Sequence, residues 1–189
     1  MYFLARPEAK EIEAFLTQAR EQPFSYTAVG ATREAAAPAG YTVDHNRIKL
    51  GTGGECFKAA ADAIRSWKMF DLGWVSLHPP TTPIEESRNV AVLVEHLGFF
   101  SLNAARIVYT LDDPDRFGFA YGTLTDHGES GEERFLVEID SQTGEVWYDL
   151  YAFSRPGNIL STLGFLYARS LQKQFARESL AAMHRAVNR

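Results

Sequence analysis

The sequence predicts an α+β fold in which a curved antiparallel sheet of about six or seven strands grips a long C-terminal helix. Three strand-like runs, residues 117–124, 134–140 and 145–153, follow one another and are joined by polar turns. A long amphipathic segment comes directly after them, and no repeated strand–helix–strand alternation indicates a parallel sheet. A sheet with one apolar face needs a cover, and a helix of about 28 residues, roughly 42 Å long, can lie across it.

The first forty residues predict a helical extension that precedes the main body. Residues 7–22 form its helix, because Pro7 suits the first turn and Ile12, Phe15 and Ala19 recur at helical spacing. Residues 24–32 favour a strand, and the Ala-Pro-Gly tract over 35–40 predicts a loop. We expect one domain over 1–189, with an extension over 1–40 and the helix-grip body over 41–189.

The body begins with a predicted strand over 41–50 and a glycine-rich turn over 51–54. A second helix follows, because Phe57, Ala60, Ala61, Ile64 and Trp67 recur on one face. From Trp74 onward the apolar period changes to two, which predicts strands over 74–77, 89–96 and 99–111, the last with a bend near 101–103.

The terminal helix shows one apolar stripe and one basic stripe. We expect the apolar residues to face the sheet and the basic ones to face water, and burial of the apolar stripe contributes on the order of 10 kcal/mol before ordering entropy is subtracted. The apolar stripe consists of Leu160, Leu163, Tyr167, Leu171 and Phe175, and the basic stripe of Arg169, Lys173 and Arg177.

Composition excludes several classes of function. A net charge of −5 argues against a nucleic-acid partner, and no run of 18 apolar residues predicts a transmembrane segment. The first residues lack the basic and apolar regions of a signal peptide, so we expect a cytoplasmic protein. Cys56 is the only cysteine, which excludes an internal disulfide and zinc sites built on paired thiolates.

Several blocks of the sequence resemble a known family. They are Tyr26 with Gly30-Ala31-Thr32, Gly40-Tyr41, residues 50–53, Trp67 with Phe70 and Trp74, and residues 106–109, 117–124, 131–135 and 152–156. In these blocks the chain is similar to domain-of-unknown-function family nineteen-ninety, found in bacteria and plants. The resemblance implies the START-like, pollen-allergen-like helix-grip superfamily, whose members enclose an apolar cavity that often holds a lipid, sterol or polyketide. A lipid-like or polyketide-like small molecule is therefore the expected partner, and the oligomeric state stays open.

Two motifs suggest chemistry but favour simpler interpretations. The turn over 51–54 lacks both the third glycine of a dinucleotide loop and the Gly-Lys-Ser/Thr of a nucleotide loop, so a structural turn is favoured over an anion site. Residues 126–133 combine carboxylates with His127, which suits a hard cation or acid–base chemistry. A solvated hairpin loop is favoured there, with Gly128 and Gly131 supplying positive φ angles.

The five histidines show no paired spacing, so we expect neither a metal site nor a cofactor. His78, at a strand end beside Pro79, is the histidine most suited to a ligand site. A satisfied structural role is the favoured alternative for it.

Arg106 stands in an apolar strand and needs a partner. Glu138 and Asp149, on neighbouring strands, are the expected partners, and Glu138 is counted with Arg106 among the expected ligand-binding residues. An ion pair that sets strand register is favoured over a cavity arginine that holds the acidic head of an amphipathic ligand.

The remaining predicted ligand-binding residues are tyrosines and one arginine. Tyr109, Tyr121 and Tyr148 can add hydroxyl groups to the cavity, although packing is the commoner role of a tyrosine in a strand. Residues 154–156 mark the expected change from strand to helix, with Ser154 or Asn158 as cap. Arg155 is disfavoured at a helix start, so it pairs with an acid or lines the cavity mouth.

The sequence therefore favours a protein that binds a small hydrophobic or amphipathic molecule between sheet and helix. One alternative is an enzyme of the cyclase, hydrolase or dehydratase type that uses His78, Arg106 or a buried carboxylate; its catalytic residues are unknown. A second alternative is a protein-interaction or membrane-surface module that uses the basic stretch 158–189.

Overall fold

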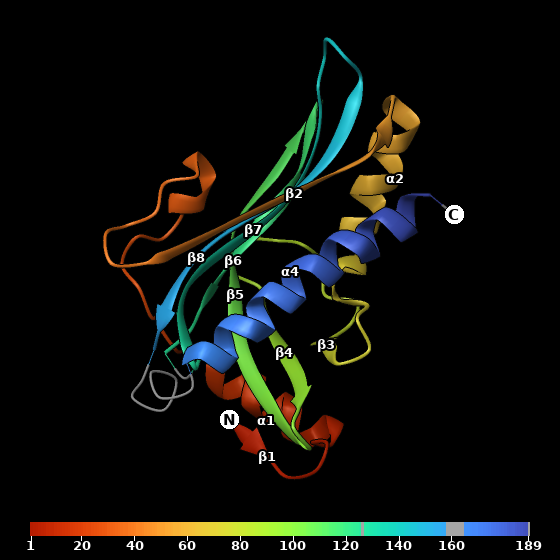
Figure 1. Ribbon diagram of the computed structural model, residues 1–189. Coiled ribbons are helices and arrows are strands. Elements are labelled where there is room, and N and C mark those ends of the chain that lie inside the picture. The colour runs from red at the N-terminus through yellow and green to blue at the C-terminus, as the bar shows by residue number, and fades with distance from the viewer. Residues whose placement is uncertain (126, 158–164, 189) are drawn as a thin grey trace.

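The computed structural model describes residues 1–125, 127–157 and 165–188, and its eight strands form one antiparallel sheet (Figure 1). The sheet order is β2-β8-β7-β6-β5-β4-β3, and the short β1 pairs with β5. The strands are β1 Tyr2–Phe3, β2 Thr42–Thr52, β3 Val75–His78, β4 Asn89–His96, β5 Phe99–Asp113, β6 Arg116–Thr123, β7 Glu129–Ile139 and β8 Glu145–Pro156. The helices are α1 Ala9–Ala19, α2 Gly54–Arg65 and α4 Phe165–Val187, with short 3₁₀ helices η1 Ala31–Glu34 and η2 Lys68–Phe70.

The predicted fold class is confirmed. Strands β3 to β8 form a continuous antiparallel meander, and β2 closes the far edge by pairing with β8. The strand predicted over 89–96 has the same bounds in β4, and both predicted N-terminal helices are present. The extra strand, β1, is too short to have shown a period.

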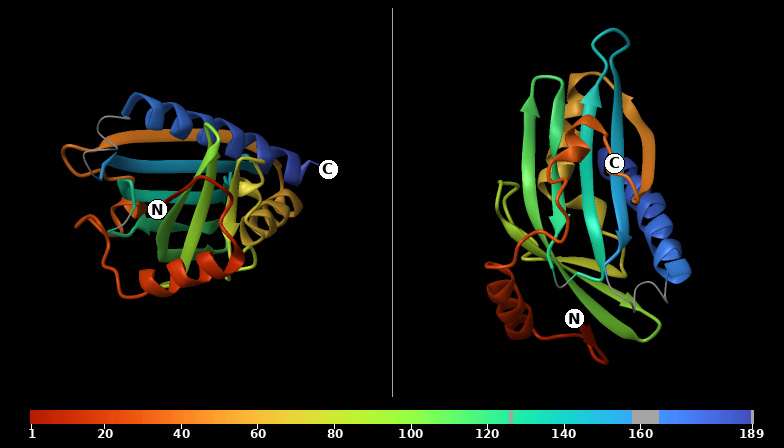
Figure 2. Two further views of the ribbon diagram at one scale, coloured as in Figure 1. Left: turned by 90° about the horizontal axis from the view of Figure 1, so that it is seen from below. Right: turned by 90° about the vertical axis from the view of Figure 1, so that its left-hand side faces the viewer.

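The helices divide between the two faces of the sheet (Figure 2). Helices α2 and α4 cover one face, called here the α4 face, and α1 and η1 cover the other, called the α1 face. None of the helices in the described part of the chain is long and apolar enough to cross a membrane.

One half of the α4 face is packed solid. Phe119 and Phe135 stack with ring centroids 5.1 Å apart, and Trp67 meets Phe119 edge-on at 4.8 Å. Met183 and Ala176 of α4 are buried in the same cluster. Large side chains alternate toward this face along β6 and β7, so the C-terminal half of α4 has a continuous apolar surface to pack on.

The other half of the α4 face carries small side chains. The strand register places them next to one another across the sheet. Ala105 of β5 pairs with Thr123 of β6, and Gly131 of β7 pairs with Ser154 of β8, which lies two residues beyond Ala152. Short side chains cannot reach a helix that stands the normal packing distance from a sheet. This half therefore leaves space beneath the first part of α4.

On the α1 face, a buried carboxylate holds the extension in place. Glu132 is 2% exposed and accepts hydrogen bonds from the Tyr26 hydroxyl at 2.6 Å and from the Gly30 amide at 2.7 Å. The Thr32 amide (3.0 Å) and hydroxyl donate to its other oxygen. The strand predicted over 24–32 is wrong, because these amides bind a side chain instead of a ladder; only Phe24 makes a β-bridge, with Leu124.

Three features of the terminal segment also differ from prediction. Strand β8 continues to Pro156, so residues 154–156 do not open the helix. Tyr167 is 38% exposed and is not part of a buried stripe, whereas Ser179 is fully buried. Arg169 binds Asp44 instead of facing water. The predicted cap Asn158 and the stripe residues Leu160 and Leu163 lie outside the described residues.

Replacing Gly131 with alanine is expected to lower the free energy of unfolding by at least about 2 kcal/mol, because overpacking against backbone is costly. A Cβ at Gly131 would lie 2.0 Å from the carbonyl oxygen of Phe153 on β8. Gly54→Ala, at the start of α2, would place its Cβ in open space and is the matched control, expected within about 0.5 kcal/mol of the parent. Urea unfolding of both variants checks this, and equal midpoints would contradict it.

Candidate functional site

A cavity of about 590 Å³ lies between the small-residue half of the sheet and the first part of α4. This volume falls within the range that binds small molecules. Its apolar wall comes from several elements: Phe70, Trp74, Val92, Val94, Leu171 and Phe175. The prediction of an apolar cavity between sheet and helix thus has a physical counterpart, since the space is not filled by aromatic rings.

A row of polar groups crosses the floor of this cavity. Strand register places Asp44, Ala152, Glu133 and Tyr121 side by side on β2, β8, β7 and β6. The Tyr121 hydroxyl donates a hydrogen bond to Oε2 of Glu133 at 2.8 Å. Burial raises the pKa of Glu133 to about 7, although the hydrogen bond from Tyr121 opposes this shift. The single methyl group of Ala152 leaves the space above this row open.

Two polar side chains of α4, Arg169 and Gln172, bind strands at the edge of the cavity. Arg169 binds both carboxylate oxygens of Asp44, with Nη2 to Oδ1 at 2.7 Å, in the forked geometry typical of arginine–carboxylate pairs. Gln172, one turn further along α4, donates to Glu129 and to the Ser154 hydroxyl, the latter at 3.1 Å. Burial raises the pKa of Glu129, and the hydrogen bond from Gln172 opposes this effect.

His127 completes the acidic end of the cavity. Its Nδ1 accepts a hydrogen bond from the backbone amide of Glu129 at 3.0 Å. Burial is the main reason that the pKa of His127 falls to about 4, so the ring is neutral at physiological pH. An imidazole that accepts through Nδ1 carries its proton on Nε2, where it remains a donor.

The solvated hairpin predicted over 126–133 is wrong from Glu129 onward. Strand β7 begins at Glu129, and neither Gly128 nor Gly131 has a positive φ. Because side chains alternate along a strand, Glu129 and Glu133 point into the cavity while Glu132 points to the α1 face. A charge run that looked solvated therefore supplies buried carboxylates to both faces of the sheet. Asp126 lies outside the described residues.

Among the seven residues predicted to bind a ligand, Tyr121 lines the cavity. Tyr148 faces the same side of the sheet but lies in the packed half, where its hydroxyl pairs with Ser179 Oγ at 3.0 Å. Burial raises the pKa of Tyr148. Its position supports packing of α4 instead of contact with a ligand.

Arg106 and Tyr109 are on the opposite face, which corrects the prediction for both. Arg106 donates to Asn89 Oδ1 at 2.8 Å and to the carbonyl oxygens of Ala19 (3.0 Å) and Arg20 (2.9 Å), so it caps α1 and does not pair with Glu138 or Asp149. The register shift between Ile107 and Tyr109 turns the Tyr109 side chain toward Thr32, whose hydroxyl lies 2.9 Å away.

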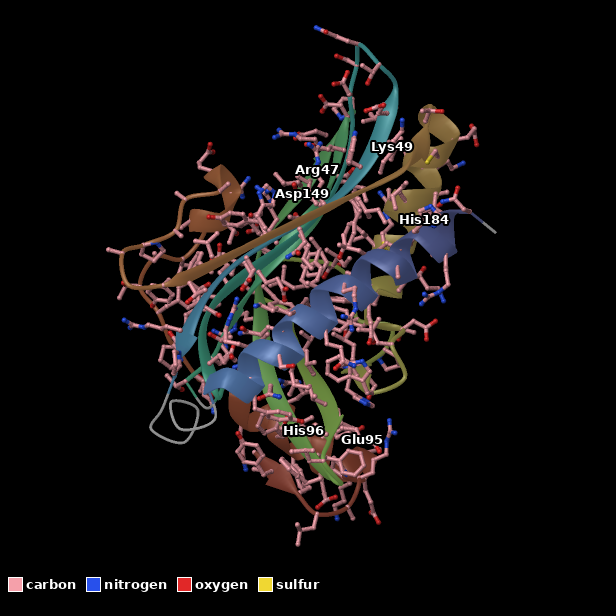
Figure 3. The ribbon with its side chains drawn as sticks, in the orientation of Figure 1. Arg47, Lys49, Glu95, His96, Asp149 and His184 are labelled. Atoms are coloured by element: carbon pink, nitrogen blue, oxygen red, sulfur yellow. The ribbon has the colours of Figure 1, made fainter. Side chains whose placement is uncertain are left out.

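The other three predicted residues also lie outside the cavity wall. Glu138 forms a surface ion pair with Arg47, which also lies beside Asp149 (Figure 3). His78 lies at the end of β3, 3.1 Å from Ser76 Oγ, and burial followed by the charge of Arg6 lowers its pKa. Arg155 stacks over the Tyr41 ring at 4.6 Å and borders a separate polar recess.

Sequence reasoning missed most of the cavity's polar groups. Asp44, Glu129, Glu133, Gln172 and His96 all line it. His96 lies at the end of β4, and its ring centroid is 4.1 Å from that of Phe99. In Figure 3 it is well separated from His184 of α4. Extending the period of two from β7 back to residue 129 would have paired Glu129 with Glu133 on one face. Among the described residues, no cluster of three or more His, Cys, Asp or Glu side chains could hold a metal ion.

The sequence is similar to a family model and to several known proteins. A family model described as a domain of unknown function (DUF1990) matches residues 25–182. A UPF0548 protein of Dictyostelium discoideum is 36% identical over 207 residues, covering 99% of this chain and 96% of its own. A UPF0548 protein of Deinococcus radiodurans is 35% identical over 199 residues, covering 99% of both chains.

Solved structures share the fold at low identity. A protein from Nitrosomonas europaea aligns with a TM-score of 0.53 at 6% identity, over 80% of this chain and 97% of its own. Ara h 8.0201 aligns with a TM-score of 0.50 at 11% identity, over 78% of this chain and 98% of its own. These similarities show the helix-grip fold, and at such identities they show the fold alone.

Proposed function

Since this chain belongs to the DUF1990 family, whose description names no activity, we propose a function from the chemistry of its cavity. The protein binds a small, mostly apolar molecule that carries an amine or another hydrogen-bond-donating group. The observation that supports this most directly is that two carboxylates, Glu129 and Glu133, face a cavity whose wall is mostly apolar.

The apolar part of the ligand is favoured by the cavity wall. Aromatic and branched side chains on both the sheet and α4 surround the space, so an apolar group that enters it leaves water. Trp74 is part of this wall and donates its indole N–H to Glu178 at 2.6 Å, which keeps the ring in place.

The polar part of the ligand is favoured by the charge of the floor. Within the described residues, no cation forms an ion pair with Glu129 or Glu133, and the one nearby arginine, Arg169, is neutralised by Asp44. A carboxylate ligand would meet like charge and no free cation, whereas an amine or hydroxyl would complete the hydrogen bonding of the acids. The hypothesis of an arginine that holds an acidic head is abandoned, because Arg106 caps α1.

Three ligands that share one ring system test the preference: 2-naphthylethylamine, 2-naphthylethanol and 2-naphthylacetate. At pH 7.5 we expect the amine and the alcohol to raise the melting temperature, since a ligand that binds only the folded state stabilises it. The acid is expected to bind at least about 10-fold more weakly than the amine, which corresponds to about 1.4 kcal/mol. Equal or tighter binding of the acid would refute the assignment of the head group.

A blocked cavity supplies the control for location. Ala152→Phe places a ring on the floor between Asp44 and Glu133 and should abolish the shift produced by the amine. Ala14→Phe, on the exposed side of α1, adds the same ring away from the cavity and should leave the shift unchanged. Circular dichroism verifies that both variants fold. Undiminished binding to folded Ala152→Phe would mean that the ligand binds elsewhere.

One observation also favours the enzymatic alternative. Several titratable groups with shifted pKa values face a single cavity, an arrangement that is enriched at catalytic sites.

A further inference from the structure

The two oxygens of the Glu133 carboxylate have different surroundings. Oε2 is held by the Tyr121 hydroxyl at 2.8 Å, and this contact sets the orientation of the carboxylate plane. Oε1 accepts no hydrogen bond from the described residues, and it belongs to a side chain that lines the cavity. A carboxylate with one anchored and one free oxygen can take a proton from a molecule in front of it without first losing a partner.

The surroundings of Glu133 make it a stronger base than an exposed carboxylate. Phe70, Leu171 and Phe175 line the same space, so an apolar substrate that fills it displaces water from the free oxygen. The charged and titratable groups that surround it are Tyr121 on β6, Glu129 on the same strand, Asp44 on β2, Tyr148 on β8 and Arg169 on α4. Arg169 is engaged by Asp44, so no cation in this set directly stabilises the charge of Glu133.

We propose that Glu133 is a general base of a catalytic site in this cavity and that Tyr121 is its positioning residue. The substrate class is a small, mostly apolar molecule with a weakly acidic C–H bond, such as a carbon next to a carbonyl or imine group. Oε1 of Glu133 takes the proton, the C–H electron pair moves into the substrate, and the proton is returned to the rearranged product or to water. The inference depends on the proposed function, because the substrate must occupy the same cavity.

The ring opening of 5-nitrobenzisoxazole tests the base with a probe that needs no cofactor. The base removes the ring C–H proton, its electron pair forms the nitrile, the N–O bond breaks, and a coloured cyanonitrophenolate leaves. We expect the parent protein to accelerate this reaction and Glu133→Gln to lower kcat/KM by about 100-fold or more, the usual contribution of a general base. Glu138→Gln, a surface carboxylate on the same strand, is expected to leave the rate unchanged.

The pH profile separates a positioning role of Tyr121 from a purely structural one. The rate of the parent should rise with pH to a midpoint near the Glu133 pKa of about 7. Because the hydrogen bond from Tyr121 lowers the pKa of Glu133, Tyr121→Phe should move this midpoint to higher pH. An unmoved midpoint in Tyr121→Phe would refute the positioning role.

Two further results would overturn the assignment. If Glu129→Gln abolishes turnover and Glu133→Gln does not, the base is Glu129. Binding is measured in parallel with 5-nitroindole, which has the same shape and cannot undergo ring opening. If 5-nitroindole raises the melting temperature but the probe is not turned over above the level of Ala152→Phe, the catalytic proposal fails and the binding proposal stands. If neither compound interacts with the protein but 2-naphthylethylamine does, the catalytic proposal fails alone; if none of the three interacts, both proposals fail.

Discussion

Glu132→Gln is expected to lower the free energy of unfolding by about 3–5 kcal/mol, because each buried donor left without an acceptor costs about 1–3 kcal/mol. Four donors converge on this carboxylate, two on each oxygen: the Tyr26 hydroxyl, the Gly30 amide, and the amide and hydroxyl of Thr32. A glutamine amide has one acceptor oxygen and one NH₂ group. In either orientation the NH₂ therefore faces two of these donors.

The measurement is urea unfolding followed by circular dichroism, with Glu138→Gln as the matched control. Glu138 lies on the same strand but forms a surface pair with Arg47, so its substitution should cost no more than about 1 kcal/mol. Hydrogen exchange should also accelerate at the amides of Gly30 and Thr32 in Glu132→Gln. Similar unfolding midpoints for the two variants would contradict a role for Glu132 in holding the extension on the sheet.

Glu133→Gln is expected to change how stability depends on pH. The pKa of Glu133 is about 7 in the folded protein, against 4.5 for an ordinary glutamate, so the folded state holds this proton more tightly than the unfolded chain. The stability contributed by the protonated side chain is fully present below pH 4.5 and is lost as the pH rises through 7. The full difference corresponds to on the order of 3 kcal/mol.

Unfolding free energies of parent and variant, measured from pH 4.5 to 8, check this prediction. Stability of Glu133→Gln relative to the parent should increase across this interval, because glutamine has no charge to bury. The contributions of Glu129 and His127 are common to both proteins and largely cancel in the difference. If the difference in unfolding free energy between variant and parent does not change with pH, the pKa of Glu133 is not raised in the folded protein, and the argument that Glu133 is a stronger base than an exposed carboxylate fails.

Local periodicity accounts for how well the elements could be predicted. Helices α1 and α2 and strands β4 to β8 each carry an apolar repeat of 3.6 or two residues that their own sequence displays. The strand prediction for residues 24–32 failed because the amides of Gly30 and Thr32 donate to a carboxylate about a hundred positions away in the sequence. No local pattern contains that partner.

The site was less predictable than the helices and strands, because it depends on which face of the sheet each side chain occupies. Tyr109 is one of three strand tyrosines expected in the cavity, but the register shift between Ile107 and Tyr109 turns it to the α1 face. Glu133 was assigned to a solvated turn because the charge run obscured the start of β7. Arg169 was assigned to the wet side of α4, although Asp44 of β2 lies within reach.

The amino-acid sequence alone determined the helix-grip class, the order of its elements and the family, because these follow from short-range repeats and recognisable blocks. The tertiary structure decided where the cavity lies and which groups face it. Small residues on four different strands become one open floor only when the register aligns them. Consecutive carboxylates of one strand acquire opposite roles because alternate side chains face opposite layers, one closing the extension onto the sheet and the other entering the cavity.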